Sequence, residues 1–538
     1  MNRILSLILS IITALSGFVF AIPEDGFFSY NEQIEDCDIS QLSENSGYVK
    51  NTMLVIFEED ASLLDKLSVF SKSGALSGVI KDLDLYVITT DNMSYTELNA
   101  LCDKVSLMDN VAIACICPAK KLSEQYTPDD PFNDENGYWN SDWDDENPDG
   151  NNWHIEATDT RSAWGYKSLF THINIGVVDG GFDTEHEELK GKIAFPTNRE
   201  ERKNRPNHHG THVAGIIAAE QDNSVGLSGI CSDSTLICVD WSPSTNQLWI
   251  PDLEVLQALR RVVKAGAKVI NFSVGNSSSM GDNNYEFPSI VPDLDGMLYS
   301  YSMGSLLQKG YDFVVVQSAG NGNGEGYAVD ASQNGLFCSI TKKNAFLPFS
   351  DVDINDVLDR VIIVGSAGLT KDGYMQSSSS NTGDRVDICA PGIDVFSCTK
   401  DNTYLRKSGT SMAAPVVTGI ASLVWCVNPE LTGAEVKSII CKNTKGEVLP
   451  AEERHYDFLN YKTYPLVNAK LAVEASLKAT GDFYDVSINT GKKEEVTFTN
   501  ENGDEFIFET TSDGSLTCVL QKGKYILQTT DGIEEIVV

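Results

Sequence analysis

The sequence Gly409-Thr410-Ser411-Met412-Ala413-Ala414-Pro415 joins a loop to a long apolar segment, residues 413–427, that predicts a buried helix. The small residues of this stretch let another polypeptide backbone approach the hydroxyl of Ser411. A hydroxyl presented at the start of a helix can act as a nucleophile when a base and an orienting carboxylate lie close to it. The rest of the chain must then supply both partners.

A candidate carboxylate ends the apolar segment of residues 173–178, which is typical of a buried parallel strand. Asp179 follows this segment directly and precedes Gly180 and Gly181. In open α/β sheets, ligands bind at the carboxyl ends of the strands, and the two glycines leave room for an imidazole. A helix-capping or turn aspartate is the alternative interpretation.

A candidate base lies in His209-Gly210-Thr211-His212-Val213-Ala214-Gly215, which predicts a closely packed helix with a histidine at its start. Three of the seven histidines, including His208, cluster here. A zinc site is one alternative, but His209 and His212 lack the carboxylate and the third ligand expected of a zinc helix. A purely structural histidine is the other alternative.

Asp179, His209 and Ser411 occur in the order carboxylate, imidazole, hydroxyl, which is the order of the subtilisin triad. The three segments around them resemble the signature motifs of subtilisin-like serine proteases, the S8 family. The resemblance implies a three-layer α/β fold, with a mainly parallel sheet flanked by helices, and a serine endopeptidase that forms an acyl-enzyme on Ser411. Gly180 departs from the family, which commonly has serine or threonine after the triad aspartate.

The resemblance also implies an oxyanion hole. Asn321 follows the apolar run of residues 314–318, and by similarity its side-chain amide would donate to the oxyanion beside the N–H group of Ser411. An asparagine at a turn before Gly322 is the alternative interpretation.

Two wall segments of the primary specificity pocket are implied in the same way. One belongs to a strand along which a peptide substrate would pair through main-chain hydrogen bonds, and the other directly precedes Asn321. Plain core strands would explain the same residues equally well. The six wall residues are Ser273, Val274, Gly275, Ser318, Ala319 and Gly320.

The composition of the chain bounds its class. With 538 residues, of which 41% are hydrophobic, the chain is globular and too long for a single core, so we expect several domains. The formal net charge of −37 argues against nucleic-acid binding and favours an acidic surface that could bind cations.

The N-terminus has the features of a secretory signal peptide over residues 1–21. Arg3 precedes the apolar run of residues 4–20, and Val19-Phe20-Ala21 fits a cleavage site. An uncleaved membrane anchor is the alternative, because the run approaches the minimum spanning length. We expect a secreted or extracellular protein, or one associated with the cell surface, without a membrane span after signal removal.

Residues 22–125 predict an inhibitory propeptide. Their order of strands and helices resembles the chaperone-like propeptide of subtilases, and an unrelated accessory domain is the alternative. The enzyme would then be a zymogen that cleaves itself near Tyr126, where the sequence resembles the mature start of thermitase-type enzymes, or after Lys120-Lys121. The expected strands are 53–57, 83–89 and 111–117, and the expected helices are 61–71 and 94–108.

A peptidase domain over residues 126–480 would follow, with a surface insertion over residues 324–358. From residue 481 to residue 538 the pattern changes to alternating strands with glycine turns and resembles a small prealbumin-like β-sandwich. This β-rich domain would bind a partner, cover the protease or stabilise it. Its expected core positions are Val496, Phe498, Phe506, Phe508, Leu516, Cys518, Leu520, Tyr525 and Leu527.

Calcium is the cofactor that the resemblance implies. The loop at residues 222–226, after the histidine helix, resembles the family's calcium loop, and hard cations need clustered oxygen ligands. Carried over by position, Asp130, Glu188 and Asn223 would be side-chain ligands. Glu188 stands where the family usually has aspartate, so its extra methylene changes the geometry.

The twelve cysteines do not form a recognisable disulfide framework. Most of them occupy apolar segments, as small core residues do. Pairs of Cys231 with Cys238, or of Cys389 with Cys398, remain open because sequence alone cannot establish connectivity.

The leading functional interpretation is a secreted endopeptidase that acts on proteins or peptides, with its own propeptide as inhibitor and first substrate. A surface interaction protein that keeps the scaffold only for display or self-processing is the alternative. An α/β-hydrolase esterase is disfavoured, because the segment around Ser411 lacks the second glycine of the nucleophile elbow and the triad order differs.

Overall fold

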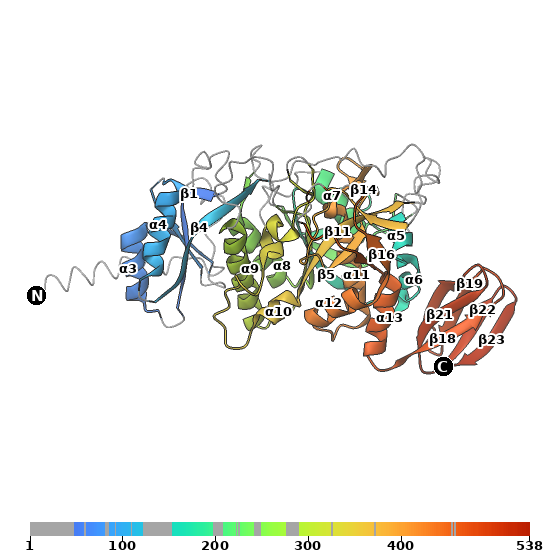
Figure 1. Cartoon of the computed structure of the whole chain (residues 1–538). Helices are drawn as coiled ribbons and strands as arrows, with labels where there is room; N and C mark the ends of the chain where they lie inside the picture. The colour runs from blue at the N-terminus through green and yellow to red at the C-terminus, as the bar shows by residue number, and fades with distance from the viewer. Residues whose placement is uncertain are drawn as a thin grey trace, which may run out of the picture. The chain divides into compact units, whose positions relative to one another are not determined.

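The computed structural model describes residues 48–538, except residues 59–60, 81–84, 92, 109, 122–152, 197–207, 222, 224–225, 241–248, 276–289, 324–325, 371–372, 453, 455 and 457–458. The predicted signal peptide, the predicted cleavage site near Tyr126 and the predicted ligand Asp130 lie outside the described residues. The chain forms two compact units (Figure 1). The first comprises Met1–Lys121 and Trp249–Gln257, and the second comprises Leu122–Leu248 and Ala258–Val538.

The first unit is an antiparallel sheet of order β2-β3-β1-β4-β8 with two helices, α3 (Leu63–Ser73) and α4 (Tyr95–Ser106). Both helices begin with a capping box, in which a serine and an acidic residue three positions later satisfy each other's backbone N–H groups. The predicted strands and helices are present. The strands are β1 (Tyr48–Phe57), β2 (Ala75–Ile80), β3 (Leu85–Thr89), β4 (Val111–Lys121) and β8 (Trp249–Pro251).

Strand β2 was not predicted from the sequence. It is the edge strand of this sheet, and its register shifts between Leu76 and Gly78. The shift inserts Ser77 into the strand and interrupts the alternation of apolar and polar residues by which a strand is recognised.

The second unit is built on a ten-stranded sheet of order β12-β16-β17-β13-β11-β10-β9-β5-β7-β6. The strands from β17 to β6 in this order pair in parallel. The strands are β5 (Ile173–Asp179), β6 (Ile193–Ala194), β7 (Ser234–Asp240), β9 (Val269–Phe272), β10 (Val314–Ser318), β11 (Val361–Thr370), β12 (Gly373–Gln376), β13 (Ile388–Pro391), β16 (Thr444–Leu449) and β17 (Tyr464–Val467).

The direction in which strands are added reverses at β5. Strands β6 and β7 lie on one side of β5, whereas β9, β10, β11 and β13 follow one another on its other side. Such a reversal opens a crevice at the carboxyl ends of the strands, where ligands bind in open α/β sheets. Asp179, Ser273 and Ser318 stand at these ends, so the topology alone brings three predicted site residues to one edge.

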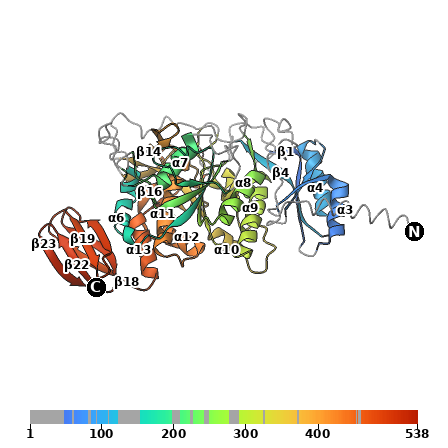
Figure 2. The same cartoon turned by 180° about the vertical axis from the view of Figure 1, so that it is seen from behind.

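Helices cover both faces of this sheet. α7 (His208–Ala218) and α11 (Thr410–Val427) pack together on one face, with α11 against β9, β10 and β11, while α9 (Ile290–Gln308) lies on the other (Figures 1 and 2). α11 is the one described helix that is long and apolar enough to cross a membrane, but 94% of it is buried in the protein, as in a core helix. Further helices are α5 (Trp153–Ala157), α6 (Thr160–Trp164), α8 (Asp252–Lys264), α10 (Ile354–Leu358), α12 (Gly433–Lys442) and α13 (Ala469–Ala479).

The prediction that residues 324–358 form a surface insertion is wrong for the central part of that segment. Two short 3-10 helices, η6 (Ala331–Asn334) and η7 (Leu336–Ser339), are buried there. The ring of Phe337 lies 5.0 Å from that of Phe272 in β9 and 4.9 Å from that of Tyr299 in α9. The segment therefore fills the space between the sheet and α9.

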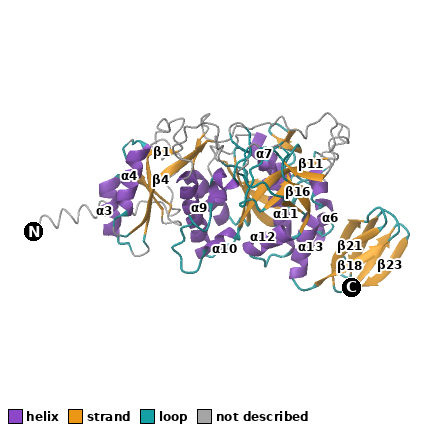
Figure 3. Ribbon diagram, viewed as in Figure 1, coloured by secondary structure: helices purple, strands orange, loops and turns teal. Residues whose placement is uncertain are grey.

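Beyond α13 the chain consists of strands only, shown in orange near the C-terminus in Figure 3. β18 (Phe483–Asn489) pairs with β21 (Ser515–Gln521). β20 (Glu505–Glu509), β19 (Glu495–Asn500), β22 (Lys524–Thr529) and β23 (Gly532–Val537) form a four-stranded sheet in that order. All nine predicted core positions are buried, and the strands are consistent with the predicted β-sandwich.

Tyr166 joins these strands to the rest of the second unit. Its ring lies 5.1 Å from that of Phe508, and its hydroxyl donates to Glu474 Oε1 of α13 over 2.9 Å. The same hydroxyl accepts the N–H group of Val519 over 2.9 Å. The C-terminal strands thus share a hydrophobic core with the helices beside them. The predicted α/β architecture, with a mainly parallel sheet flanked by helices and a β-rich C-terminal region, is confirmed.

Candidate active site

Asp179 and His209 form a hydrogen-bonded pair, with 2.6 Å between Asp179 Oδ1 and His209 Nδ1. Asp179 is 1% exposed, and its Oδ1 also accepts the N–H group of Gly180 over 2.6 Å. The buried carboxylate can therefore hold the imidazole with Nδ1 protonated, the tautomer in which Nε2 acts as the base. Asp179 Oδ2 has no hydrogen-bond partner among the described residues, and Gly180 has no hydroxyl to offer it.

Two glycines let the start of α7 approach the turn after β5. A Cβ atom at Gly210 would lie 2.3 Å from the carbonyl oxygen of Gly181, so any other residue would push the helix away. Thr211 Oγ1 accepts the N–H group of Asp183 over 3.0 Å and fixes the same contact. The glycine after His209 is therefore part of what positions the imidazole.

Ser411 is the second residue of α11 and stands at the carboxyl end of β9. Its hydroxyl donates to the carbonyl oxygen of Ser273 over 3.3 Å, and Ser273 Oγ donates in return to the carbonyl oxygen of Ser411 over 2.8 Å. Asn271 Nδ2 donates to Ser273 Oγ, and Thr418 Oγ1 donates to Asn271 Oδ1. This chain of bonds holds the first turns of α11 against the strand.

Asn321 is oriented by the residue before the nucleophile. Its Oδ1 accepts from both the N–H group and the hydroxyl of Thr410, over 2.8 and 2.9 Å. Thr410 Oγ1 accepts in turn from the N–H group of Gly320 over 3.1 Å. Because the oxygen of the Asn321 amide is occupied, its Nδ2 is left to donate, as an oxyanion hole requires. Sequence reasoning missed this role of Thr410, although the residue lies within the nucleophile motif.

The two predicted pocket walls lie at the ends of adjacent strands. β9 and β10 pair in parallel, and Gln317 Nε2 donates to the carbonyl oxygen of Val274 over 3.1 Å, which ties the walls together. Asn334 lies between them, fully buried, and its Nδ2 donates to the carbonyl oxygen of Ser318 over 2.9 Å. Sequence reasoning missed Asn334 because the segment around it was predicted to be a surface insertion.

The predicted calcium ligands Glu188 and Asn223 lie in contact. Glu188 is fully buried, and burial raises the pKa of its carboxyl group. Its Oε2 accepts from Asn223 Nδ2 and its Oε1 from the N–H group of Leu227, each over 2.9 Å, and the Tyr404 hydroxyl lies 3.4 Å from Oε1. Hydrogen-bond donors surround this carboxylate, rather than the additional oxygen ligands that a cation would need. As placed, the described residues do not fit a cation, and they contain no cluster of three or more His, Cys, Asp or Glu that could hold a metal.

His212 has a structural place in this fold. Its Nε2 lies 3.0 Å from the carbonyl oxygen of Leu405, and burial lowers its pKa well below the usual value. The neutral ring fills the space between α7 and the hairpin of β14 (Val395–Thr399) and β15 (Thr403–Lys407). The second histidine of the motif, His212, is thus accounted for as a buried packing residue, and its presence does not require a metal.

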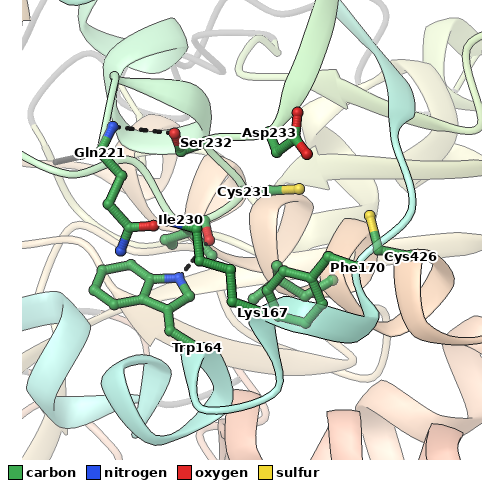
Figure 4. A pocket seen from close by; sticks show the side chains of 10 residues that line it. Trp164, Lys167, Phe170, Gln221, Ile230, Cys231, Ser232, Asp233 and Cys426 are labelled. Carbon is green, nitrogen blue, oxygen red and sulfur yellow. Dashed lines mark hydrogen bonds between the residues drawn. The ribbon is translucent and has the colours of Figure 1, made fainter. Parts of the chain in front are cut away.

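The described cysteines are free thiols, and neither of the two pairs left open by the sequence is formed. Instead, Cys231 and Cys426 line a small cavity of about 30 Å³, and Figure 4 shows their sulfur atoms facing one another. Contact with Cys231 and burial raise the pKa of Cys426. Cys426 follows Ser411 by fifteen residues, about 22 Å along α11, so this cavity is remote from the catalytic edge.

Comparisons with known proteins agree with this geometry. Residues 171–472 match the subtilase family, Peptidase S8. The chain is 27% identical over 429 residues to the thermophilic serine proteinase of Bacillus sp. (strain AK1), covering 79% of this chain and 89% of that protein. It is 28% identical over 284 residues to subtilisin DY of Bacillus licheniformis, covering 52% and 85%.

The fold is similar to that of fervidolysin from Fervidobacterium pennivorans, a keratinolytic enzyme related to subtilisin. The TM-score is 0.55 at 19% sequence identity, over 90% of this chain and 71% of that one. The family match covers more than half of the 538 residues and includes Asp179, His209, Asn321 and Ser411. The chain therefore belongs to the subtilase family and is a serine endopeptidase.

Proposed function

We propose that this protein is a secreted endopeptidase, made as a zymogen, that hydrolyses peptide bonds through an acyl-enzyme on Ser411. The observation that supports the proposal is that the Asp179–His209 pair and the Ser411 segment lie at the carboxyl ends of the adjacent parallel strands β5 and β9. Asp179 is paired with His209, Asn321 is oriented by Thr410, and Ser411 stands at the start of α11.

In the proposed reaction, the Ser411 hydroxyl turns from the Ser273 carbonyl toward His209 Nε2 and gives up its proton as Oγ attacks the substrate carbonyl. Asn321 Nδ2 and the N–H group of Ser411 stabilise the oxyanion, while Asp179 stabilises the imidazolium. His209 then protonates the leaving amine. A water molecule, deprotonated by the same imidazole, attacks the ester carbonyl; as the bond to Ser411 Oγ breaks, His209 gives this proton to Oγ, which releases the second product and restores the Ser411 hydroxyl.

The propeptide role is a proposal about residues 22–125. It is supported by the compact α+β unit that begins at β1 and by its place ahead of the peptidase motifs. Removal of this unit near Tyr126 would leave the peptidase of residues 126–480 with the β-rich region of residues 481–538. Export follows from the signal-like residues 1–21, and the family's secreted members are consistent with it.

Calcium binding near Glu188 is also a proposal, because subtilases commonly bind calcium. The buried carboxylate would gain from a nearby cation, since burial raises its pKa. The site would need Asp130 and a half-turn of the Asn223 amide so that its oxygen faces the ion. Chelation should then lower the Tm, and added Ca²⁺ should restore it. An unchanged Tm would reject the site.

Full-length protein and its Ser411→Ala variant test the proposed function. We expect wild type to react with a fluorophosphonate probe, hydrolyse peptides and show a new N-terminus near residue 126. Ser411→Ala should do none of these, whereas Ser487→Ala, at an exposed position of β18, should behave as wild type. A surface interaction protein would show no probe labelling, and processing retained in Ser411→Ala would contradict the assignment.

A further inference from the structure

We propose that Cys231 and Cys426 form a disulfide bond when the protein folds in an oxidising compartment. The bond would join the segment that follows α7 to the C-terminal end of α11. The proposal rests on the export that is part of the proposed function, because thiols are kept reduced in the cytosol but are oxidised in extracellular proteins.

The two thiols face one another at the small cavity that they line (Figure 4). Both side chains are buried, since Cys231 is 3% exposed and Cys426 is 2% exposed. Contact with the Cys231 thiol is the largest cause that raises the pKa of Cys426, ahead of burial. The two sulfur atoms are therefore neighbours, and the cavity of about 30 Å³ gives them room to rotate toward each other.

Both cysteines stand on segments that backbone hydrogen bonds hold in place. The N–H group of Cys231 donates to the carbonyl oxygen of Ile217 in α7 over 2.8 Å. The carbonyl oxygen of Cys426 accepts the N–H group of Thr171 over 3.1 Å and its hydroxyl over 2.7 Å. The fold therefore sets the direction of both side chains, and a disulfide needs a defined geometry of this kind.

The bond would connect two helices that carry catalytic side chains. α7 has the proposed base near its start, and α11 has the proposed nucleophile near its start. α11 also comes close to the segment after α7, because a Cβ atom at Gly419 would lie 2.6 Å from Cβ of Ile230. A bond between Cys231 and Cys426 would therefore link the far ends of these helices and leave the catalytic edge untouched.

The surroundings of the pair favour a disulfide over a metal ion. Trp164, Phe170 and Leu423 line the same cavity, and their apolar surfaces suit a neutral disulfide better than two thiolates and a cation. The described residues contain no group of three or more metal-ligating side chains that could complete a metal site. The exposed residues Lys167 and Asp233 also line the cavity, so the pair lies just below the surface.

The oxidant in the proposed step is a small-molecule disulfide, such as oxidised glutathione, that acts while the chain folds. The Cys231 thiolate attacks one of its sulfur atoms, which forms a mixed disulfide and releases one small thiolate. Cys426 then loses its proton and attacks the Cys231 sulfur, which releases the second small thiolate. Two protein thiols are thus oxidised, and one small disulfide is reduced to two thiols that take up the two protons. We assign the first attack to Cys231, because the raised pKa of Cys426 disfavours its thiolate.

Full-length Ser411→Ala protein, made by cell-free synthesis with oxidised and reduced glutathione, tests the bond without interference from proteolysis. The soluble protein is alkylated under denaturing conditions and digested, and its peptides are identified by mass spectrometry. We expect the peptides that contain Cys231 and Cys426 to be linked to each other. Alkylation of both cysteines, or a bond from either one to another cysteine, would overturn the proposal.

The Tm measures what the bond contributes to stability. The oxidised protein should melt about 3–6 °C above the same protein made with a reductant, because the bond closes a loop of about 195 residues. Cys231→Ala in the same background should lose this difference, whereas Cys441→Ala, at a partly exposed cysteine, should keep it. A difference that persists in Cys231→Ala would place the stabilising bond elsewhere and overturn the proposal. If Cys231→Ala does not fold, the peptide analysis of the parent protein decides.

The outcomes for this proposal and for the proposed function are distinguishable. The bond is measured in a chain that lacks its nucleophile, so absent proteolysis does not affect the result. A chain that its natural host does not export refutes the export part of the proposed function, and the cell-free experiment still shows whether the pair forms. An exported, active enzyme in which both thiols stay reduced refutes the disulfide alone.

Discussion

Two buried carboxylates lie at opposite ends of α7, and they have different partners. At the start of the helix, Asp179 is paired with His209, a side chain that can accept a full positive charge. Past the helix end, Glu188 is surrounded by neutral donors from Asn223, Leu227 and Tyr404. Burial of the two groups is similar, since Asp179 is 1% exposed and Glu188 0%.

The difference teaches that burial alone does not make a carboxylate catalytic. A buried negative charge beside an imidazole becomes more stable when the imidazole takes a proton, so it can lower the energy of a charged transition state. Around Glu188, burial raises the pKa of the carboxyl group and outweighs the hydrogen-bond donors and the more distant His186 imidazole, which lower it. We therefore expect substitutions of Asp179 to lower catalytic activity and substitutions of Glu188 to lower the stability of the fold.

The largest effect should come from Asp179→Asn. An asparagine keeps the shape but favours the wrong imidazole tautomer, so kcat should fall by about 10⁴-fold while the Tm changes little. Steady-state kinetics on the purified variant, normalised to folded protein by circular dichroism, measure this. Glu188→Gln is the matched control and should keep kcat within about threefold of wild type. A comparable loss of kcat in both variants would remove the distinction between the two sites.

Glu188→Ala should lose stability instead. It removes the acceptor of the Asn223 amide and of the Leu227 N–H group, and the latter is a buried backbone donor, at a total cost of about 2–4 kcal/mol. For a unit of this size the Tm should fall by about 2–5 °C, measured by calorimetry. Glu185→Ala, at an exposed position whose carboxylate pairs with the exposed Lys190, should change the Tm by no more than about 1 °C. An equal fall in both variants would show that the buried cluster does not stabilise the protein.

The same contrast explains what the sequence predicts well. Asp179, His209, Asn321 and Ser411 could be placed because each sits in a motif whose glycines and small residues leave few backbone arrangements. The alternating strands of the C-terminal region were also predictable, since period-two burial depends only on neighbouring residues.

The environments of Glu188 and Asn334 could not be predicted, because their partners come from distant segments. Tyr404 approaches Glu188 from the β14–β15 hairpin, and Ser318 approaches Asn334 from β10. The local pattern of apolar and polar residues carries no information about contacts between such distant segments. The same limit applies to buried η7, whose partner rings lie in β9 and α9.

A smaller effect on activity is expected from Thr410→Val, which keeps the shape of the side chain but removes a neutral donor to Asn321 Oδ1. The Asn321 amide should then be held less firmly, and kcat should fall by about tenfold, less than the 10²- to 10³-fold expected when an oxyanion donor is lost outright. KM should stay nearly constant, because the interaction matters most in the transition state. A fall in Tm that accounts for the lost activity would instead assign Thr410 a structural role.

The smallest effect concerns the pH dependence of stability at Glu188. Because its pKa is raised in the folded protein above the ordinary value of 4.5, the folded state binds a proton more readily than the unfolded state. The stability contributed by this proton is fully present below pH 4.5 and is lost as the pH rises through the folded pKa. Glu188→Gln, which cannot titrate, should therefore lose less stability than wild type as the pH rises above 4.5. Urea denaturation at half-unit pH steps measures the difference. Parallel curves for the two proteins would mean that Glu188 titrates alike in the folded and the unfolded protein, and the contrast between the two ends of α7 would then rest on activity alone.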